Sequence, residues 1–495
     1  MICRRIVLLI VILLLMPALV LATPLADKVV EHRLANGLRL LMVERHDTPT
    51  VAAYITIGVG AVNETSETRG VAHLLEHMLF KGTTTLGTTD YAKEQPLLAE
   101  IEQVGTELDR LRSQPDADPV KINALEGHLR ELQERHRPFV IKDVFSQLYS
   151  ENGAVGFNAF TAKDMTTYLV SLPSNKLELW ALLESERMKH AVLREFYTER
   201  DVIREERRRS YETNPDGLLY ETLLATAFTV HPYRNPIIGW HSDIASLSLA
   251  ETRDFLHRYY APVNTTIALV GDIRAADAIA LVERYFGDIA PGDPVPPVTV
   301  VEPEQRGEKR VTINFDAEPR LSMAFHKPTL PSKDDYVFDL IDQVLGQGRT
   351  SRLYKRLVEE LQLATSVSVH GAPGSRYPNL FVIEATPRHP HTVSEVEAAL
   401  IAELDRLRSE EISKYEIEKA RNRLLTDNLR ALRSNSGLAR MLTTYQTLAG
   451  NWRYLVTYEE KIGGLTAADV QETARRWLTP QNRTVVTLVR EEVKP

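Results

Sequence analysis

The segment His73-Leu74-Leu75-Glu76-His77 carries the side chains with the clearest capacity for chemistry. On a helix, two histidines four residues apart lie on one face, so both imidazoles can bind a single metal ion. Zinc suits imidazole ligands, and a catalytic zinc keeps one coordination position for water. Glu76 lies on the adjacent strip, where it can act as general base on a zinc-bound water. The spacing therefore predicts His73 and His77 as metal ligands and Glu76 as the catalytic base.

The neighbours of this segment argue against two incidental histidines on a surface helix. Apolar residues fill the other positions of residues 71–80, including Val71, Leu75 and Phe80. A helix that is apolar nearly all round is expected to be buried. Polar side chains inside a buried helix need partners, and a metal site provides them.

A second segment, residues 199–207, is expected to supply the third ligand. Glu199, Val202, Ile203 and Glu206 fall at helical positions i, i+3, i+4 and i+7, and the arginines of the segment lie elsewhere. A carboxylate on such an apolar stripe is costly unless it is paired or binds a metal. Because seven residues span about 10 Å along a helix, we expect one of the two glutamates to bind the metal and the other to support the site. The spacing alone leaves open which does which.

The rest of the chain is expected to form an α+β fold of two similar halves. Residues 23–290 are predicted to form the first half and residues 306–495 the second, joined by the proline-rich linker 291–305. Residues 260–270 resemble residues 478–488, since each has a Pro-x-Asn turn before a β-rich run. Residues 92–138 show two helical patterns separated by a proline-bounded break, which predicts an inserted helical hairpin.

The N-terminus has the order of a secretory signal peptide. Arg4 and Arg5 precede an apolar run, and Val20-Leu21-Ala22 offers a cleavage site, which predicts a signal peptide over residues 1–22 and a periplasmic protein. An uncleaved membrane anchor is the alternative. The net charge of −8 gives no reason to expect nucleic acid as a partner.

Three segments together resemble the pitrilysin family of zinc peptidases, the inverzincins. They are residues 69–83, 158–168 and 199–206. The resemblance implies two homologous mixed α/β sandwich domains that form a clamshell, one Zn²⁺ per chain, and endopeptidase activity on extended peptides or small unfolded proteins. It also implies that Glu206 is the third zinc ligand and that Glu199 is a catalytic carboxylate that supports the site.

Asn158 and Ala159 open a β-rich run that predicts one strand over residues 160–172. On the residues alone this is an ordinary strand. The resemblance implies more, because the matching strand of the family pairs with the substrate backbone. Asn158 and Ala159 are therefore expected to contact the peptide substrate.

The second half departs from the family pattern. Residues 346–354 resemble a glycine-rich loop, but Val358 and Thr365 stand where active single-chain members carry an arginine and a tyrosine. The chain is thus similar to the zinc-bearing subunit of bacterial processing-peptidase-like heterodimers, whose paralogous partner carries that pair; a homodimer is also open. The alternative function is a non-catalytic structural or peptide-capturing subunit. Family scaffolds that lost their chemistry typically lose motif residues, whereas this chain keeps all of them.

Overall fold

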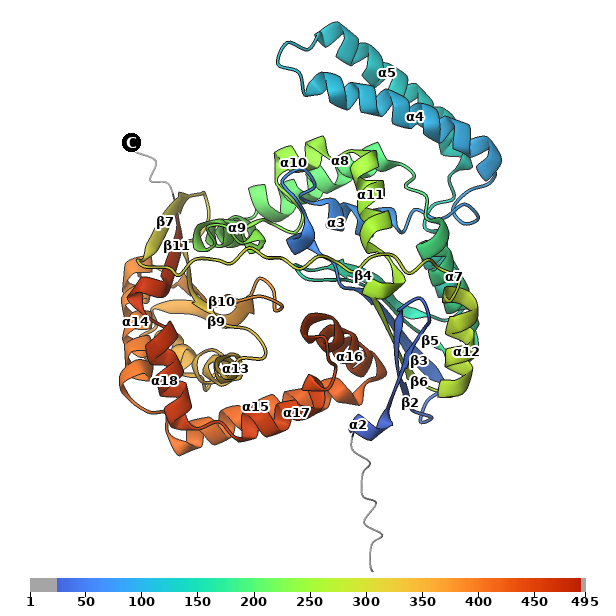
Figure 1. Ribbon diagram of the computed structural model, residues 1–495. Helices are drawn as coiled ribbons and strands as arrows, with labels where there is room; N and C mark the ends of the chain where they lie inside the picture. The colour runs from blue at the N-terminus through green and yellow to red at the C-terminus, as the bar shows by residue number, and fades with distance from the viewer. Residues whose placement is uncertain (1–24, 491–495) are drawn as a thin grey trace, which may run out of the picture.

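The computed structural model describes residues 25–490, which form two α/β halves that face one another (Figure 1). The predicted signal peptide, residues 1–22, lies outside the described residues. Among the helices that are described, none combines the length and the apolar character needed to span a bilayer.

The first half is built on a six-stranded sheet in the order β1-β2-β6-β3-β5-β4. Its strands are β1 (Val29–Arg33), β2 (Arg39–Glu44), β3 (Thr50–Ile57), β4 (Val155–Thr161), β5 (Thr166–Pro173) and β6 (Thr265–Gly271). Strand β2 is parallel to β6, and the other neighbours are antiparallel. One face is covered by helices α3 (Val71–Met78), α7 (Leu177–His190), α8 (Phe196–Arg207), α11 (Leu249–Tyr259) and α12 (Ala275–Phe286). Strand β4 therefore lies at the edge of the sheet.

The second half repeats this design. Its strands β7 (Lys309–Asn314), β8 (Arg320–Lys327), β9 (Ala364–Ala372), β10 (Asn379–Pro387) and β11 (Arg483–Val489) follow the order β7-β11-β8-β10-β9. This order matches β2-β6-β3-β5-β4, and β11 is parallel to β7 as β6 is to β2. Helices α13 (Lys333–Leu345), α14 (Val393–Ser409), α15 (Lys414–Arg433) and α18 (Ala467–Trp477) pack against it.

The two turns that suggested the repeat have the same structure. Asn264 donates from Nδ2 to the carbonyl of Tyr259 at 3.1 Å, at the end of α11, just before β6. Asn482 donates to the carbonyl of Trp477 at 2.7 Å, at the end of α18, just before β11. The predicted fold of two homologous halves is confirmed.

Each half also has one helix that packs on the sheet of the other half. Helix α9 (Pro215–Ala227) of the first half packs on β7, β8 and β11, and α16 (Asn435–Ala449) of the second half packs on β3 and β6. On α16, Leu438 and Leu442 are buried against the face of the first sheet that carries Tyr54 and Val270. This exchange explains why β3 is buried on both faces.

The predicted hairpin is present and projects from the first half (Figure 1). It consists of α4 (Tyr91–Arg112) and α5 (Pro119–His136). Asp118 caps α5 by accepting from the backbone N–H of Val120 at 2.9 Å, and Pro119 occupies the first helical position, where its fixed φ is favourable. The remaining helices are α2 (Leu25–Lys28), α6 (Val144–Glu151), α10 (His241–Ser246) and α17 (Tyr454–Gly463). Residues 288–308, all described, join the halves without forming a helix or strand.

The single strand predicted over residues 160–172 is wrong. The chain turns after Thr161, and Ala162 donates from its backbone N–H to the carbonyl of Met165 at 2.8 Å before β5 begins. No glycine or proline marks this turn. The buried side chains of Lys163 and Asp164 instead bond to the segment 233–235, so long-range contacts stabilise the turn.

Candidate metal centre

Contacts within the protein fix the position of helix α3. Its N-cap, Gly70, has φ +89°, and a Cβ at this position would come within 2.5 Å of the carbonyl of Ile238, so the site favours glycine. The half-buried Glu64 carboxylate accepts from the backbone N–H groups of Gly70 and Ala72, each at 2.9 Å. These contacts replace an N-cap side chain. The five apolar residues of α3 are buried, as predicted.

Helix α8 lies beside α3 and presents Glu199 and Glu206, two of its three glutamates, to it. The expected apolar stripe is only partly correct, because Ile203 is buried but Val202 is 48% exposed. Phe196 and Tyr197, one turn earlier, provide most of the apolar contact instead. The helix is amphipathic, but its buried face begins at Phe196, before residues 199–207, from which the apolar stripe was predicted.

Two arginines of α8 are buried rather than solvated. Arg200 contacts Asp109 at 2.8 Å and Arg207 contacts Glu221 at 2.8 Å, and all but Asp109 are at least nine-tenths buried. A buried arginine is stable only with a carboxylate partner. These ion pairs fix the rotation of α8 about its axis and hence the direction of its glutamates.

Three of the predicted ligands converge. Glu206 Oε1 lies 3.7 Å from His73 Nε2, and Glu206 Oε2 lies 3.6 Å from His77 Nε2. One donor atom from each of the three residues lies within 4.8 Å of the others. Two atoms bound to a tetrahedral zinc at about 2.0–2.1 Å would be about 3.4 Å apart. Two imidazole nitrogens and a carboxylate oxygen therefore fit a zinc ion in both chemistry and spacing, with a fourth position left for water.

The two imidazoles differ in their electronic state. Burial lowers the pKa of His73 to about 3, so the ring is neutral and can donate a lone pair. Burial also acts to lower the pKa of His77, but the hydrogen bond from its Nδ1 to Glu199 Oε1, at 2.9 Å, and nearby carboxylates raise it. Glu199 thus contacts the ring nitrogen that faces away from Glu206.

Glu199 is itself held as a carboxylate. Burial acts to raise its pKa, but the hydrogen bonds from His77 and Lys81 lower the pKa to about 2. Lys81 Nζ lies 2.5 Å from Glu199 Oε2, and the Glu199 side chain is only 10% exposed. The negative charge of Glu199 is therefore permanent at neutral pH.

Glu76 lies next to this cluster without joining it. Its Oε2 accepts a hydrogen bond from Thr161 Oγ1 at 2.6 Å, and burial raises its pKa. A carboxylate with a raised pKa is a better proton acceptor. Neither Thr161 nor Lys81 was predicted from the sequence, although each lies in a segment that carries the family resemblance.

Asn158 and Ala159 lie on β4, the strand that leads to the site. Asn158 is exposed and Ala159 is buried. Among the described residues, β4 pairs with β5 only, so its other edge is open. Thr161, the last residue of β4, reaches Glu76, so the open edge ends at the metal cluster. A cavity of about 320 Å³, lined by Glu76, His77 and Lys142 among others, adjoins the same place.

Comparison with known proteins identifies the family. The model described as Insulinase (Peptidase family M16) matches residues 39–114 and 142–240, and the model described as Peptidase M16 inactive domain matches residues 246–424. Together the two cover well over half of the chain. The chain belongs to peptidase family M16. The part that the first model skips, residues 115–141, contains helix α5 of the hairpin.

Relatives of this M16 chain are named as zinc proteases. The zinc protease PqqE of Helicobacter pylori is 24% identical over 462 residues, which cover 92% of this chain and 91% of PqqE. An uncharacterized zinc protease of Bacillus subtilis, YmxG, is 25% identical over 67% of each chain. Among solved structures, a protease from Helicobacter pylori superposes with a TM-score of 0.79 at 24% identity, covering 94% of this chain and all of that one. The periplasmic protease PqqL of Escherichia coli gives a TM-score of 0.69 at 18% identity, and the match spans 94% of this chain and 48% of PqqL. These structural matches support the two-domain fold.

Proposed function

We propose that this M16 chain is a zinc metalloendopeptidase of the inverzincin type. In this proposal His73, His77 and Glu206 hold one zinc ion, and Glu76 is the catalytic base. The observation that supports this function is the convergence of the His73 and His77 imidazoles with the Glu206 carboxylate. The Glu76 carboxylate lies beside them. The names of the relatives favour the same chemistry.

The residues of the site have separate roles in the proposed reaction. Zinc, when bound, supplies Lewis acidity toward water and toward the scissile carbonyl. Glu76 accepts the proton of the attacking water and passes it to the leaving amine, and its raised pKa suits both transfers. Thr161 orients Glu76 through the 2.6 Å hydrogen bond, and Glu199 holds the His77 ring in its ligand orientation.

The substrate is an extended peptide or a small unfolded protein. An extended segment can pair with the open edge of β4 at Asn158 and Ala159, with its backbone running toward Glu76. Because such pairing uses backbone hydrogen bonds, it tolerates many side chains. We therefore expect loose sequence preference.

A partner subunit completes the active site in this proposal. Val358 packs against the core of the second half, and Thr365 is an exposed residue of the edge strand β9. Neither can replace an arginine or a tyrosine in contacting a substrate. We expect a dimer, with a second copy or with a paralogous chain that carries the Arg/Tyr pair. A signal peptide over residues 1–22 would place this chain in the periplasm.

Hydrolysis of unstructured peptides by the zinc-supplied protein tests the proposal, alone and with whatever co-purifies from the native host. We expect weak activity alone, a large gain with the partner, and a loss of at least about 100-fold in kcat for Glu76→Gln. Glu205→Gln changes the half-buried neighbour of Glu206; it is the matched control and should retain activity. If wild type and Glu76→Gln bind peptide equally and neither cleaves it, with or without the partner, the chain is a peptide-capturing or structural subunit.

A further inference from the structure

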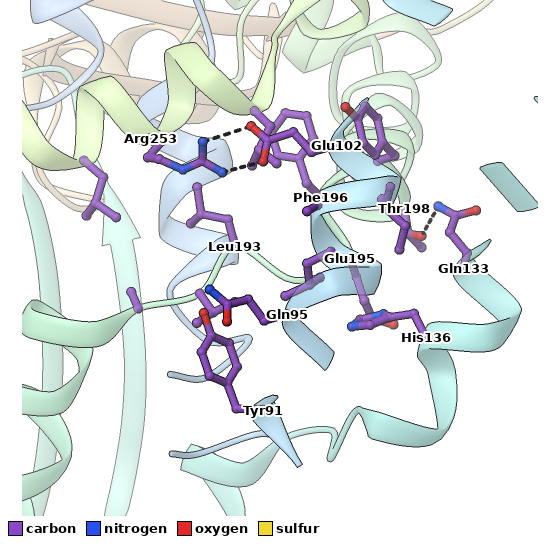
Figure 2. Close-up of a pocket in the computed structure, with 18 of the residues that line it drawn as sticks. Tyr91, Gln95, Glu102, Gln133, His136, Leu193, Glu195, Phe196, Thr198 and Arg253 are labelled. Atoms are coloured by element: carbon purple, nitrogen blue, oxygen red, sulfur yellow. Dashed lines mark hydrogen bonds and ion pairs between the residues drawn. The ribbon is translucent and has the colours of Figure 1, made fainter. Parts of the chain in front are cut away.

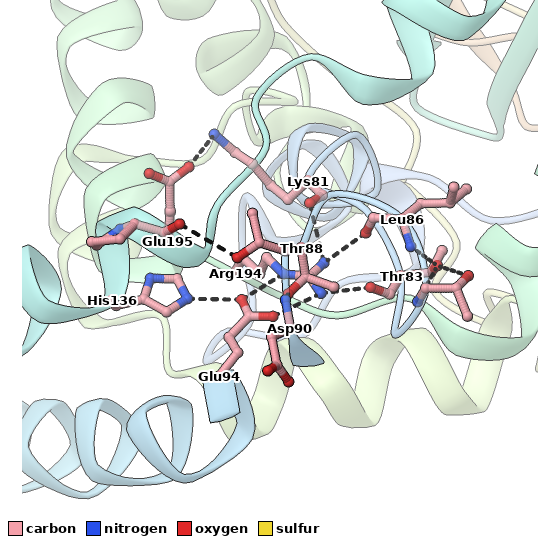
Figure 3. A network of polar contacts seen from close by, with 12 residues as sticks. Lys81, Thr83, Leu86, Thr88, Asp90, Glu94, His136, Arg194 and Glu195 are labelled. Atoms are coloured by element: carbon pink, nitrogen blue, oxygen red, sulfur yellow. Dashed lines mark hydrogen bonds and ion pairs between the residues drawn. The ribbon is translucent and has the colours of Figure 1, made fainter. Parts of the chain in front are cut away.

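A buried ion pair joins the base of the hairpin to the start of α8. Arg194 and Glu94 are both fully buried, and Arg194 contacts Glu94 through Nε at 2.7 Å and through Nη2 at 3.1 Å. His136, the last residue of α5, contacts Glu94 Oε1 through its Nε2 at 2.8 Å (Figure 3). Arg194 lies two residues before α8 begins. Helix α4 is therefore anchored at Arg194 through Glu94, and α5 is joined to the same carboxylate through His136.

The same arginine holds the loop that follows the metal-binding helix α3. Arg194 donates to the carbonyls of Lys81 and Leu86, each at 3.3 Å, and to the carbonyl of Thr83 at 2.5 Å. Gly82 has φ +108°, and a Cβ there would come within 2.9 Å of Arg194 Nη1. The loop is therefore shaped to close around the guanidinium.

The loop in turn carries Lys81 to the metal cluster. Lys81 Nζ contacts Glu199 Oε2 at 2.5 Å and Glu195 at 3.6 Å, and Glu199 Oε1 contacts His77 Nδ1 at 2.9 Å. Polar contacts run from Glu94 through Arg194 to the backbone carbonyl of Lys81, and from the Lys81 side chain through Glu199 to His77. The hairpin lies at one end of this series and a predicted zinc ligand at the other.

A cavity lies beside the contacts between the hairpin and α8. The cavity has a volume of about 330 Å³ and is lined by Tyr91, Gln95, Phe196 and Arg253, among others (Figure 2). Around it, α4 and α5 reach α8 and α11 through separate polar contacts, such as Gln133 with Thr198 at 3.3 Å. Residues of both hairpin helices, such as Ile101 and Leu132, belong to the same buried apolar core as Phe196, so apolar packing and individual polar contacts together fix the hairpin relative to α8.

We propose that the helical hairpin α4–α5 is a positioning element for the zinc site, acting through Glu94 and Arg194. Loss of the Glu94 charge leaves Arg194 buried without its carboxylate, which releases its hold on the 81–86 loop and lets Lys81 withdraw from Glu199. Glu199 then holds the His77 ring less firmly, and zinc binds more weakly. The M16 family model matches the segments that contain Glu94 and Arg194, and it skips residues 115–141, which contain α5 and His136. The inference rests on the proposed zinc site and adds a residue set that acts on it from a distance.

Zinc affinity measured by chelator competition tests the inference, with Glu94→Gln compared to Glu102→Gln. Both residues lie on α4 and each forms a bidentate ion pair with an arginine, but the Glu102 partner is Arg253 on α11, away from the metal cluster. We expect Glu94→Gln to weaken zinc binding by about 10-fold or more, with a matching change in the visible spectrum of the Co²⁺-substituted protein. Glu102→Gln should bind zinc within about twofold of wild type.

A second variant keeps the test decisive if Glu94→Gln does not fold. Lys81→Gln removes the last link of the series without touching the hairpin, and we expect it to weaken zinc binding by about 10-fold. Wild-type affinity in a folded Glu94→Gln, or in Lys81→Gln, overturns the inference. If wild type binds zinc and Glu206→Gln does not, while the hairpin variants match wild type, only the hairpin inference fails. If wild type itself binds no zinc, the proposed function fails with it.

Discussion

Replacement of Glu199 by glutamine isolates the carboxylate that supports His77. Glutamine has nearly the same shape as glutamate, so α8 and its buried ion pairs should be preserved. The amide can still accept from His77 Nδ1 with its oxygen, but its NH₂ group then faces Lys81 Nζ, where Glu199 Oε2 now lies 2.5 Å away. Two donors would oppose each other at that position. The variant therefore weakens both contacts of Glu199 at once.

The size of the effect follows from the burial of these contacts. The Glu199 side chain is 10% exposed and its pKa is about 2, so a charged and nearly buried hydrogen-bond acceptor is lost. A hydrogen bond to a charged group contributes about 1.5–3 kcal/mol. Changes in residues that orient metal ligands cost about 10–100-fold in metal affinity, which is about 1.4–2.8 kcal/mol. The two estimates agree, and we expect zinc binding to weaken about 30-fold.

Titration against a chromophoric zinc chelator measures this change directly. Glu205→Gln serves as control, because Glu205 is on the same helix but contacts only the exposed Arg208 and Arg209. We expect the Glu205→Gln and wild-type zinc affinities to agree within about twofold. A folded Glu199→Gln that binds zinc as tightly as wild type would refute the role assigned to Glu199.

Two further predictions concern the stability of the second half and of the contact between halves. Burial, together with the charge of Asp335, raises the pKa of Asp339 from its ordinary value of 3.8 to about 7. Between pH 3.8 and about pH 7 the folded chain therefore binds more protons than the unfolded chain, so the free energy of unfolding falls as the pH rises through this window. Between pH 5 and pH 8 the difference corresponds to at most about 2.7 kcal/mol, since about two pH units of this window lie in that range. Because Asp339 lines an open cavity, we expect about half of this, so Asp339→Asn should reduce the fall in unfolding free energy between pH 5 and pH 8 by about 1 kcal/mol. An unchanged fall in urea titrations would contradict this. Asp164, which is 2% exposed, accepts from Tyr233 Oη at 2.7 Å and from the backbone N–H of Ser375 in the second half at 2.8 Å. Asp164→Asn should lower the unfolding free energy by about 2 kcal/mol, whereas the exposed Asp201→Asn should leave it unchanged; equal stability of the two variants would show that the contact between halves contributes little.

Local patterns in the sequence were sufficient to predict the elements that carry the site. The four-residue spacing of His73 and His77 on an apolar segment predicted a buried helix, and α3 is buried. The proline-bounded break predicted the hairpin, since both of its helices form from local periodicity. The stripe carrying Glu199 and Glu206 could not decide which glutamate faces the imidazole Nε2 atoms, because that depends on how α8 is rotated against α3.

Features that depend on contacts between distant residues were missed. Arg194 and Glu94 are 100 residues apart, and nothing in their local sequence indicates that they pair. The turn between β4 and β5 was overlooked for the same reason, as Lys163 and Asp164 are fixed by a segment about 70 residues away. The exchange of α9 and α16 between halves also has no local signature, because an amphipathic helix does not specify which sheet it covers.

Diffraction data collected at the zinc absorption edge, from crystals of the zinc-supplied protein, test the central claim most directly. We predict one strong anomalous peak, about 2.0–2.2 Å from His73 Nε2, His77 Nε2 and a carboxylate oxygen of Glu206. A well-ordered, metal-supplied structure with no peak between these three side chains would contradict the zinc site and the peptidase function proposed from it.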